Sequence, residues 1–144
     1  MTSISRSALV THSAANMFKL VSDVESYPQF LPWCQSASVA EQTEKHQLAT
    51  VSVDQRMRGV RFTTRNKLVT DEAIHMSLVD GPFKKLSGIW RFKPIDESGC
   101  RVELEIDFEF KSRIMGALMG AAFSRICDTM VAAFIQRADK VYQQ

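Results

Sequence analysis

Residues 113–142 read RIMGALMGAAFSRICDTMVAAFIQRADKVY, and their apolar side chains have the spacing of one long α-helix. Apolar residues four apart lie on one side of a helix, and this segment carries two such rows. The rows are Ile114, Leu118, Ala122, Ile126, Met130 and Phe134, and Met115, Met119, Phe123, Cys127 and Val131. At 1.5 Å per residue the helix would be about 45 Å long. An apolar face of that length needs a wide partner surface.

Alternation of apolar and polar residues predicts that partner surface, a meandering antiparallel sheet. The period changes to two from Ala37 onward, and residues 102–110 alternate most clearly. Five long strands are expected, at residues 49–57, 60–67, 74–78, 86–93 and 102–110. Short turns separate them at Gly59, Asp71-Glu72, Gly81-Pro82 and residues 96–99.

The N-terminal third predicts a short strand, a helix and an apolar loop. Residues 4–10 can form the strand, and Ser13 has the character of a helix N-cap. Residues 27–34, YPQFLPWC, then break regular structure with two prolines while carrying three aromatic side chains. Such a loop normally covers the core or the mouth of a pocket. The economical arrangement is an α+β fold in one domain, residues 1–144, with a curved sheet wrapped around the C-terminal helix.

Composition predicts a soluble protein of the cytoplasm. The 18 basic and 16 acidic residues give a net charge of +2, which implies no partner by itself. Cys34, Cys100 and Cys127 match neither a disulfide framework nor a zinc motif, so reduced thiols are expected. The N-terminus lacks the apolar core of a signal peptide. The longest nearly uncharged run, residues 114–124, is shorter than the ~20 residues of a transmembrane helix.

Catalysis is the poorest fit to this sequence, and no catalytic residue, metal or cofactor is expected. The histidines, His12, His46 and His75, stand in separate segments without an activating partner. An acidic row on one strand could resemble a metal or acid–base array. We instead expect it to be a solvated strand face, paired with Arg91 and Lys93 across the hairpin. The row is Glu103, Glu105, Asp107 and Glu109.

The inner face of the sheet and helix either packs solid or leaves an apolar cavity. The methionine and glycine content and the aromatic loop favour a cavity, which would take a long, uncharged, flexible hydrophobic ligand. The predicted lining of the sheet is Met57, Phe62, Met76, Leu78, Phe83, Leu86, Trp90 and Phe108. The helix would add Leu118, Met119, Phe123, Ile126 and Met130, and the loop Tyr27, Phe30 and Trp33.

Basic residues on the polar side of two strands form a second predicted site. Arginine side chains bind phosphate oxygens at two points, which suits RNA or lipid headgroups. A charged outer face is also what any half-solvated sheet shows, so this alternative stays open. The basic residues are Arg56, Arg58, Arg61, Arg65 and Lys67.

Three segments together resemble the polyketide-cyclase-like branch of the START superfamily, closest to its coenzyme Q-binding proteins and ribosome-association toxins. The segments are residues 27–34, residues 81–92 (GPFKKLSGIWRF) and residues 133–138 (AFIQRA). The resemblance implies a helix-grip fold. It also implies two kinds of relative: lipid chaperones that bind ubiquinone and support respiration, and toxins that bind the large ribosomal subunit and block subunit joining.

Three functional hypotheses follow. The leading one is a non-catalytic carrier of ubiquinone or a similar isoprenoid lipid, with the basic row in peripheral contact with the inner membrane. The second is a translation inhibitor that docks on ribosomal RNA of the large subunit through the basic row. The third, a cyclase or another enzyme, lacks an acid–base pair in this chain.

Overall fold

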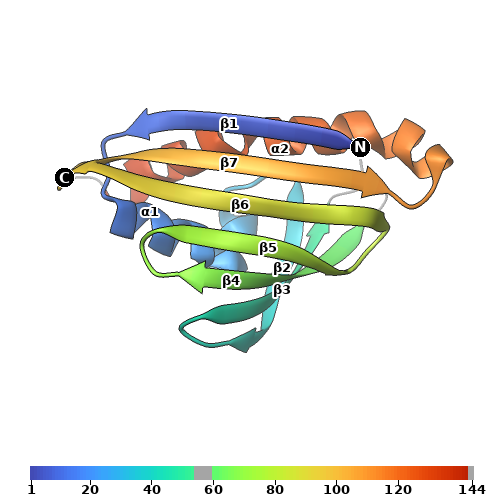
Figure 1. Ribbon diagram of the computed structural model, residues 1–144, viewed down its shortest axis with the longest axis horizontal. Coiled ribbons are helices and arrows are strands. Elements are labelled where there is room, and N and C mark those ends of the chain that lie inside the picture. Colours follow the sequence, from blue (N-terminus) through green and yellow to red (C-terminus); the bar gives the residue numbers. More distant parts are fainter. Residues whose placement is uncertain (54–59, 143–144) are drawn as a thin grey trace.

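The computed structural model describes residues 1–53 and 60–142, and it has two layers, a sheet and a long helix (Figure 1). The helices are α1 (Ala14–Ser22), the 3-10 helix η1 (Val24–Gln29) and α2 (Arg113–Val141). The strands are β1 (Thr2–Val10), β2 (Cys34–Gln42), β3 (His46–Val53), β4 (Arg61–Val69), β5 (Ala73–Asp80), β6 (Phe83–Asp96) and β7 (Gly99–Phe110). The predicted α+β helix-grip architecture is confirmed.

The strands of the described residues form one antiparallel sheet of seven strands, in the order β1-β7-β6-β5-β4-β3-β2. Consecutive strands pair as hairpins from β2 to β7, and β1 adds to the edge of β7. The five strands expected from the sequence correspond to β3–β7. The missing strand, β2, is largely exposed, and its sequence CQSASVAEQ has few apolar residues to reveal a period.

The helix α2 runs behind β1 and β7 in Figure 1 and covers one face of the sheet. It begins at Ser112, whose hydroxyl accepts hydrogen bonds from the backbone N–H groups of Ile114 and Met115. Its buried positions follow one stripe of the helix: Met119, Phe123, Cys127, Val131, Phe134 and Ala138. The long C-terminal helix is thus confirmed almost to the residue.

One of the two predicted rows on α2 does not stay on the buried side. Ile114 is 72% exposed and Leu118 is 64% exposed, so Leu118 was wrongly placed in the lining. Residues four apart overshoot a full helical turn by about 40°, because a turn takes 3.6 residues. Over five steps the row therefore crosses from the solvent side at Ile114 to the core at Phe134, which is fully buried.

On length and composition alone, α2 would qualify as a membrane span. The nearly uncharged run 114–124 within it is shorter than a membrane span, and the helix qualifies only when its whole length is considered. The same test is met by core helices of folded domains, and α2 packs its buried stripe against the sheet.

Candidate functional site: an apolar cavity between the sheet and α2

A small cavity of about 80 Å³ lies between the sheet and the middle of α2. Nine side chains predicted for the lining do line it, namely Tyr27, Trp33, Phe62, Met76, Leu86, Trp90, Phe123, Ile126 and Met130. They come from η1 and the following loop, from β4, β5 and β6, and from α2. The fold therefore brings together residues that are up to about a hundred positions apart in the chain.

Other predicted lining residues lie elsewhere. Phe83 and Phe108 belong to a tightly packed aromatic cluster, and Met119 is buried outside the cavity. Phe30 packs between the Arg137 guanidinium and the Phe134 ring and does not reach the cavity. Leu78 is half-buried near the end of β5 and does not reach the cavity. Met57 lies outside the described residues.

The sequence reasoning missed several lining residues: Val24, Ala49, Val51, Thr64, Asn66, Ser87, Gly88, Ile106 and Cys127. Most of these residues are small or occupy inward positions of strands, next to larger apolar residues that give the clearer pattern. The position of Asn66 in the sequence did indicate an unusual buried residue. It stands where the alternation of β4 calls for an apolar residue, because Thr64, Asn66 and Leu68 share the buried face.

Thr64 and Asn66 belong to a buried hydrogen-bonded row at one side of the cavity. The Thr64 hydroxyl donates to Asn66 Oδ1 at 2.8 Å, and Asn66 Nδ2 donates to Gln47 Oε1 at 2.8 Å. Gln47 Nε2 in turn donates to the backbone carbonyl of Ser22 at 3.1 Å and to Gln42 Oε1 at 3.0 Å. Gln47 is 1% exposed and Asn66 is 4% exposed, so the partners offset the cost of burying these amides.

The cavity is electrically neutral. In the described part of the chain its lining contains no Lys, Arg, His, Asp or Glu. Burial raises the pKa of the Cys127 thiol to about 12, and burial likewise raises the pKa of Tyr27, so both stay protonated near neutral pH. Tyr27 donates its hydroxyl proton to the Val21 carbonyl at 2.5 Å. Among residues 1–53 and 60–142, the lining therefore offers no group that would exchange a proton with a substrate near pH 7.

The cavity is small but has compliant walls. A dry cavity of about 150 Å³ is needed to admit a benzene ring, so a ring-bearing ligand must widen this one. Met76 and Met130 line it, and methionine side chains change rotamer at low cost. Met76 extends over the backbone of Gly88, where an added Cβ would lie 2.7 Å from Met76 Cε. The absence of a side chain at Gly88 thus leaves room for Met76 to move.

A surface groove adjoins the cavity at Trp33, which lines both. The groove runs between the proline loop and the C-terminal half of α2, with Leu31, Pro32 and Ala133 among its walls. At its edge the Arg137 guanidinium lies 5.0 Å from the Phe30 ring centroid and donates to Gln29 Oε1 at 2.9 Å. This contact holds the loop against α2.

The predicted basic site is described only in part, because Arg56 and Arg58 lie outside the described residues. Arg61, Arg65 and Lys67 are exposed on the outer face of β4. Lys67 pairs in register with His46 on β3 and His75 on β5, so an imidazole lies on each side of it on the neighbouring strands. Among described residues, none of the three cations lies within ion-pair distance of a carboxylate.

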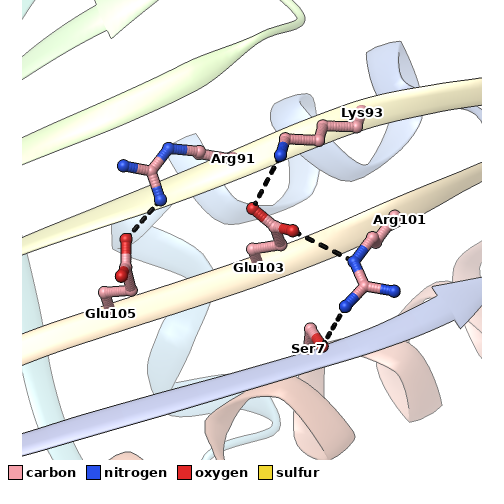
Figure 2. A network of polar contacts seen from close by, with 6 residues as sticks. All are labelled: Ser7, Arg91, Lys93, Arg101, Glu103 and Glu105. Carbon is pink, nitrogen blue, oxygen red and sulfur yellow. Dashed lines mark hydrogen bonds and ion pairs between the residues drawn. The ribbon is translucent and has the colours of Figure 1, made fainter.

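The acidic row of β7 is a set of ion pairs on the outer face of the sheet (Figure 2). Arg91 pairs with Glu105, and Glu103 receives both Lys93 at 3.3 Å and Arg101 at 3.0 Å. The expected pairing of the row with Arg91 and Lys93 is confirmed. Within residues 1–53 and 60–142, no group of His, Cys, Asp and Glu side chains has the arrangement of a metal site.

Comparison with known proteins places this geometry in a family. The family model described as polyketide cyclase/dehydrase and lipid transport matches residues 10–135. The chain belongs to this family. Its relatives include a protein of Vibrio cholerae named ribosome association toxin RatA, which is 49% identical over 142 residues and matches over 99% of each chain. The predicted START-like, RatA and coenzyme Q-binding resemblance is confirmed.

A more distant sequence relative and one solved structure are also similar to this chain. The mitochondrial coenzyme Q-binding protein coq10 of Schizosaccharomyces pombe is 28% identical, matching 92% of this chain and 84% of its own length. The Zhui aromatase/cyclase of Streptomyces sp. R1128 superposes with a TM-score of 0.87 at 17% identity, over 99% of this chain and 96% of its own. At 17% identity, the comparison with Zhui shows only that the two chains share a fold. The sequence relatives named here are a toxin and a binding protein.

Proposed function

We propose that this protein is a non-catalytic binding protein for a neutral isoprenoid lipid, ubiquinone in the first place, which it carries in support of respiration. The observation that carries the proposal is the neutral, almost wholly apolar cavity between the sheet and α2. Transferring a charged headgroup from water into such a lining would cost roughly several kcal/mol of free energy. A neutral ring would instead be stabilised by burial of its apolar surface. The lipid-transport family and the coq10 relative support the same conclusion.

The two tryptophans of the chain provide the test, because Trp33 and Trp90 both line the cavity. Quinones quench indole fluorescence on contact. Titration with decylubiquinone should therefore give saturable quenching with a stoichiometry of one. The variant Trp33→Phe should keep the saturation through Trp90. Quenching that rises linearly without saturation would contradict the proposal, since it reports only collisions in solution.

A lipid carrier must meet the membrane, and we assign this contact to the exposed end of α2, defined by Ile114 and Leu118. Lys111 and Arg113 are exposed beside these apolar side chains, which matches an interface with anionic headgroups. Replacing Ile114 and Leu118 by Ser should weaken co-sedimentation with vesicles containing phosphatidylglycerol. The matched control is Val79→Ser, which removes a residue 50% exposed on β5. Equal binding by both variants would refute the assignment.

Association with the large ribosomal subunit is the second proposed function of this cytoplasmic protein. It is favoured by the 49% identity to a protein named ribosome association toxin and by the exposed row Arg61, Arg65 and Lys67. Changing all three residues to Gln should abolish salt-sensitive co-sedimentation with the subunit, because a protein that neutralises fewer phosphates releases fewer counterions on binding. The same change at Lys19, Lys85 and Lys111 serves as the control for total charge. Unchanged co-sedimentation of the first variant would count against this surface.

A further inference from the structure

The hydrogen bonds of the polar row beside the cavity (Gln47, Asn66 and Thr64) can have only one arrangement of donors and acceptors. A backbone carbonyl accepts but cannot donate, so the atom of Gln47 next to the Ser22 carbonyl must be Nε2. Gln47 Oε1 is then the atom next to Asn66, and it must accept a hydrogen bond from Asn66 Nδ2. Asn66 consequently turns Oδ1 toward Thr64, whose hydroxyl has to donate. Reversing any member would place two acceptors or two donors against each other.

This direction leaves unused hydrogen-bonding capacity on two side chains that line the cavity, Asn66 and Thr64. The Asn66 amide has two N–H groups, and only the one directed at Gln47 takes part in a hydrogen bond of the described residues. The Thr64 hydroxyl donates its proton to Asn66, and its oxygen accepts no hydrogen bond from the described residues. Both side chains line the cavity. An otherwise apolar cavity therefore carries one amide donor, next to one weak acceptor, at a fixed place.

The opposite end of the cavity adjoins the surface groove at Trp33. In the register of β3 and β4, Asn66 faces Gln47 and Phe62 faces Val51, so Phe62 lies about 13 Å along β4 from Asn66 at 3.3 Å per residue. The pairing of Cys34 with Val53 brings the start of β2 to that same end. Trp33, directly before β2, is thus remote from the polar row and adjoins the surface groove.

We infer that the cavity orients its ligand, and this inference rests on the proposed function. A carbonyl oxygen of the ring accepts a hydrogen bond from the free Asn66 N–H, and the hydrocarbon chain leaves past Trp33 into the groove between the proline loop and α2. The ligand class that fits is a neutral carbonyl-bearing ring with a long apolar tail. Met76 and Met130 change rotamer to make room for the ring.

The first test combines two ligands with three variants. Decylplastoquinone and a decyl-dimethylbenzene compete for the cavity with the neutral fluorescent probe N-phenyl-1-naphthylamine. The second ligand has the same methyl groups and chain on a six-membered ring, but its ring is a benzene without carbonyls. Wild-type protein should prefer the quinone about tenfold, the value of roughly one buried hydrogen bond. Asn66→Leu should reduce this preference to about one. Leu9→Ser and Val79→Ser should keep it, because both replace exposed side chains outside the cavity.

The outcomes separate the inference from the function on which it rests. Equal affinity of wild-type protein for both ligands, or a preference that survives Asn66→Leu, would overturn the orientation while leaving lipid binding intact. Displacement of the probe by neither ligand would instead overturn the proposed function. Because Asn66→Leu leaves Gln47 Oε1 without its donor and costs stability, circular dichroism must show that the variant is folded.

A second measurement needs no variant. In ¹⁵N-labelled wild-type protein, saturation with the quinone should shift the side-chain amide signal of Asn66. A nitroxide at the end of the quinone tail should broaden the backbone signals of the groove, such as Ala133, and spare those of Asn66. Broadening at Asn66 with the groove unaffected would show the reverse orientation and overturn the inference.

Discussion

The interior between the sheet and α2 contains two regions that are packed in opposite ways. In the aromatic cluster, Phe83 stacks on Phe110 with ring centroids 4.7 Å apart, and Phe108 meets Phe123 edge-on at 4.7 Å. In the cavity region next to it, Met76, Met130 and Gly88 leave about 80 Å³ unfilled. Phe123 belongs to both regions. Rigid rings fill one end of the helix grip and stabilise the fold, whereas flexible and small residues keep the other end adaptable.

The largest expected effect comes from breaking the aromatic cluster. Phe83 is 1% exposed and contacts the rings of Phe62, Phe108, Phe110 and Phe123. Phe83→Ala should lower the free energy of unfolding by about 3–5 kcal/mol, measured by urea denaturation, because rigid neighbours cannot close the space. Leu118→Ala, at an exposed position of α2, should change it by about 0.5 kcal/mol or less. A loss below about 1 kcal/mol at Phe83 would mean that the two regions do not differ in rigidity.

The next effect tests whether the cavity is dry, through the Cys127 thiol that lines it. Burial raises its pKa to about 12 from the ordinary value of 9.0, so the folded protein keeps the proton while the unfolded chain loses it. This contribution to stability is therefore complete below pH 9 and is lost as the pH rises toward 12. Between pH 9 and 11 the thiol should remove about 2 kcal/mol from the free energy of unfolding.

The control for that pH dependence is Cys127→Ala. Tyr27, Cys34 and Cys100 are buried and also have a raised pKa. The free energy of unfolding of the variant should therefore still decline with pH, but by less than that of the wild type, because the contribution of Cys127 is gone. Denaturation curves of both proteins at pH 9, 10 and 11 provide the comparison. Identical declines would indicate that the thiol already reaches water in the folded state.

Filling the cavity should lower the affinity for the ligand more than it lowers the free energy of unfolding. In Gly88→Ala the new Cβ would lie 2.7 Å from Met76 Cε and push this flexible end into the cavity. The affinity for decylubiquinone should fall about tenfold, or about 1.4 kcal/mol. Tryptophan quenching measures the affinity. Unchanged affinity would show that the ligand binds elsewhere or that Met76 moves away from the cavity.

The smallest expected effect belongs to the matched glycine on α2. An added Cβ at Gly120 would meet nothing within 4 Å. Gly120→Ala should therefore raise the free energy of unfolding by about 0.5–1 kcal/mol through helix propensity alone. Quinone affinity should stay as in the wild type. A loss of affinity would extend the binding site to this outer part of the helix.

Long regular patterns in the sequence predicted the fold well. Twelve residues of β7 and twenty-nine of α2 carry their periods over enough turns and pleats to outweigh single exceptions. The exposed edge strand β2 buries too little apolar surface to show a period. Leu118 was misplaced because a row four apart slowly rotates around a helix.

For the candidate site, the sequence predicted many of the large side chains of the lining and missed the small and polar ones. An inward position on a strand does not determine whether a side chain meets a solid cluster, as Phe83 and Phe108 do, or open space, as Leu86 and Met76 do. That difference depends on how three elements approach one another, which a binary pattern does not encode. Asn66 was a visible exception to its pattern, but its partner Gln47 and its direction required the fold.

The most direct measurement is native mass spectrometry of the protein purified from its host, followed by extraction and identification of any bound lipid. We predict one neutral quinone or related isoprenoid lipid per chain, released when the protein unfolds. An empty protein that also takes up no added ubiquinone would contradict lipid binding. The cavity would then be a packing defect of an ordinary core, and ribosome association would become the leading function.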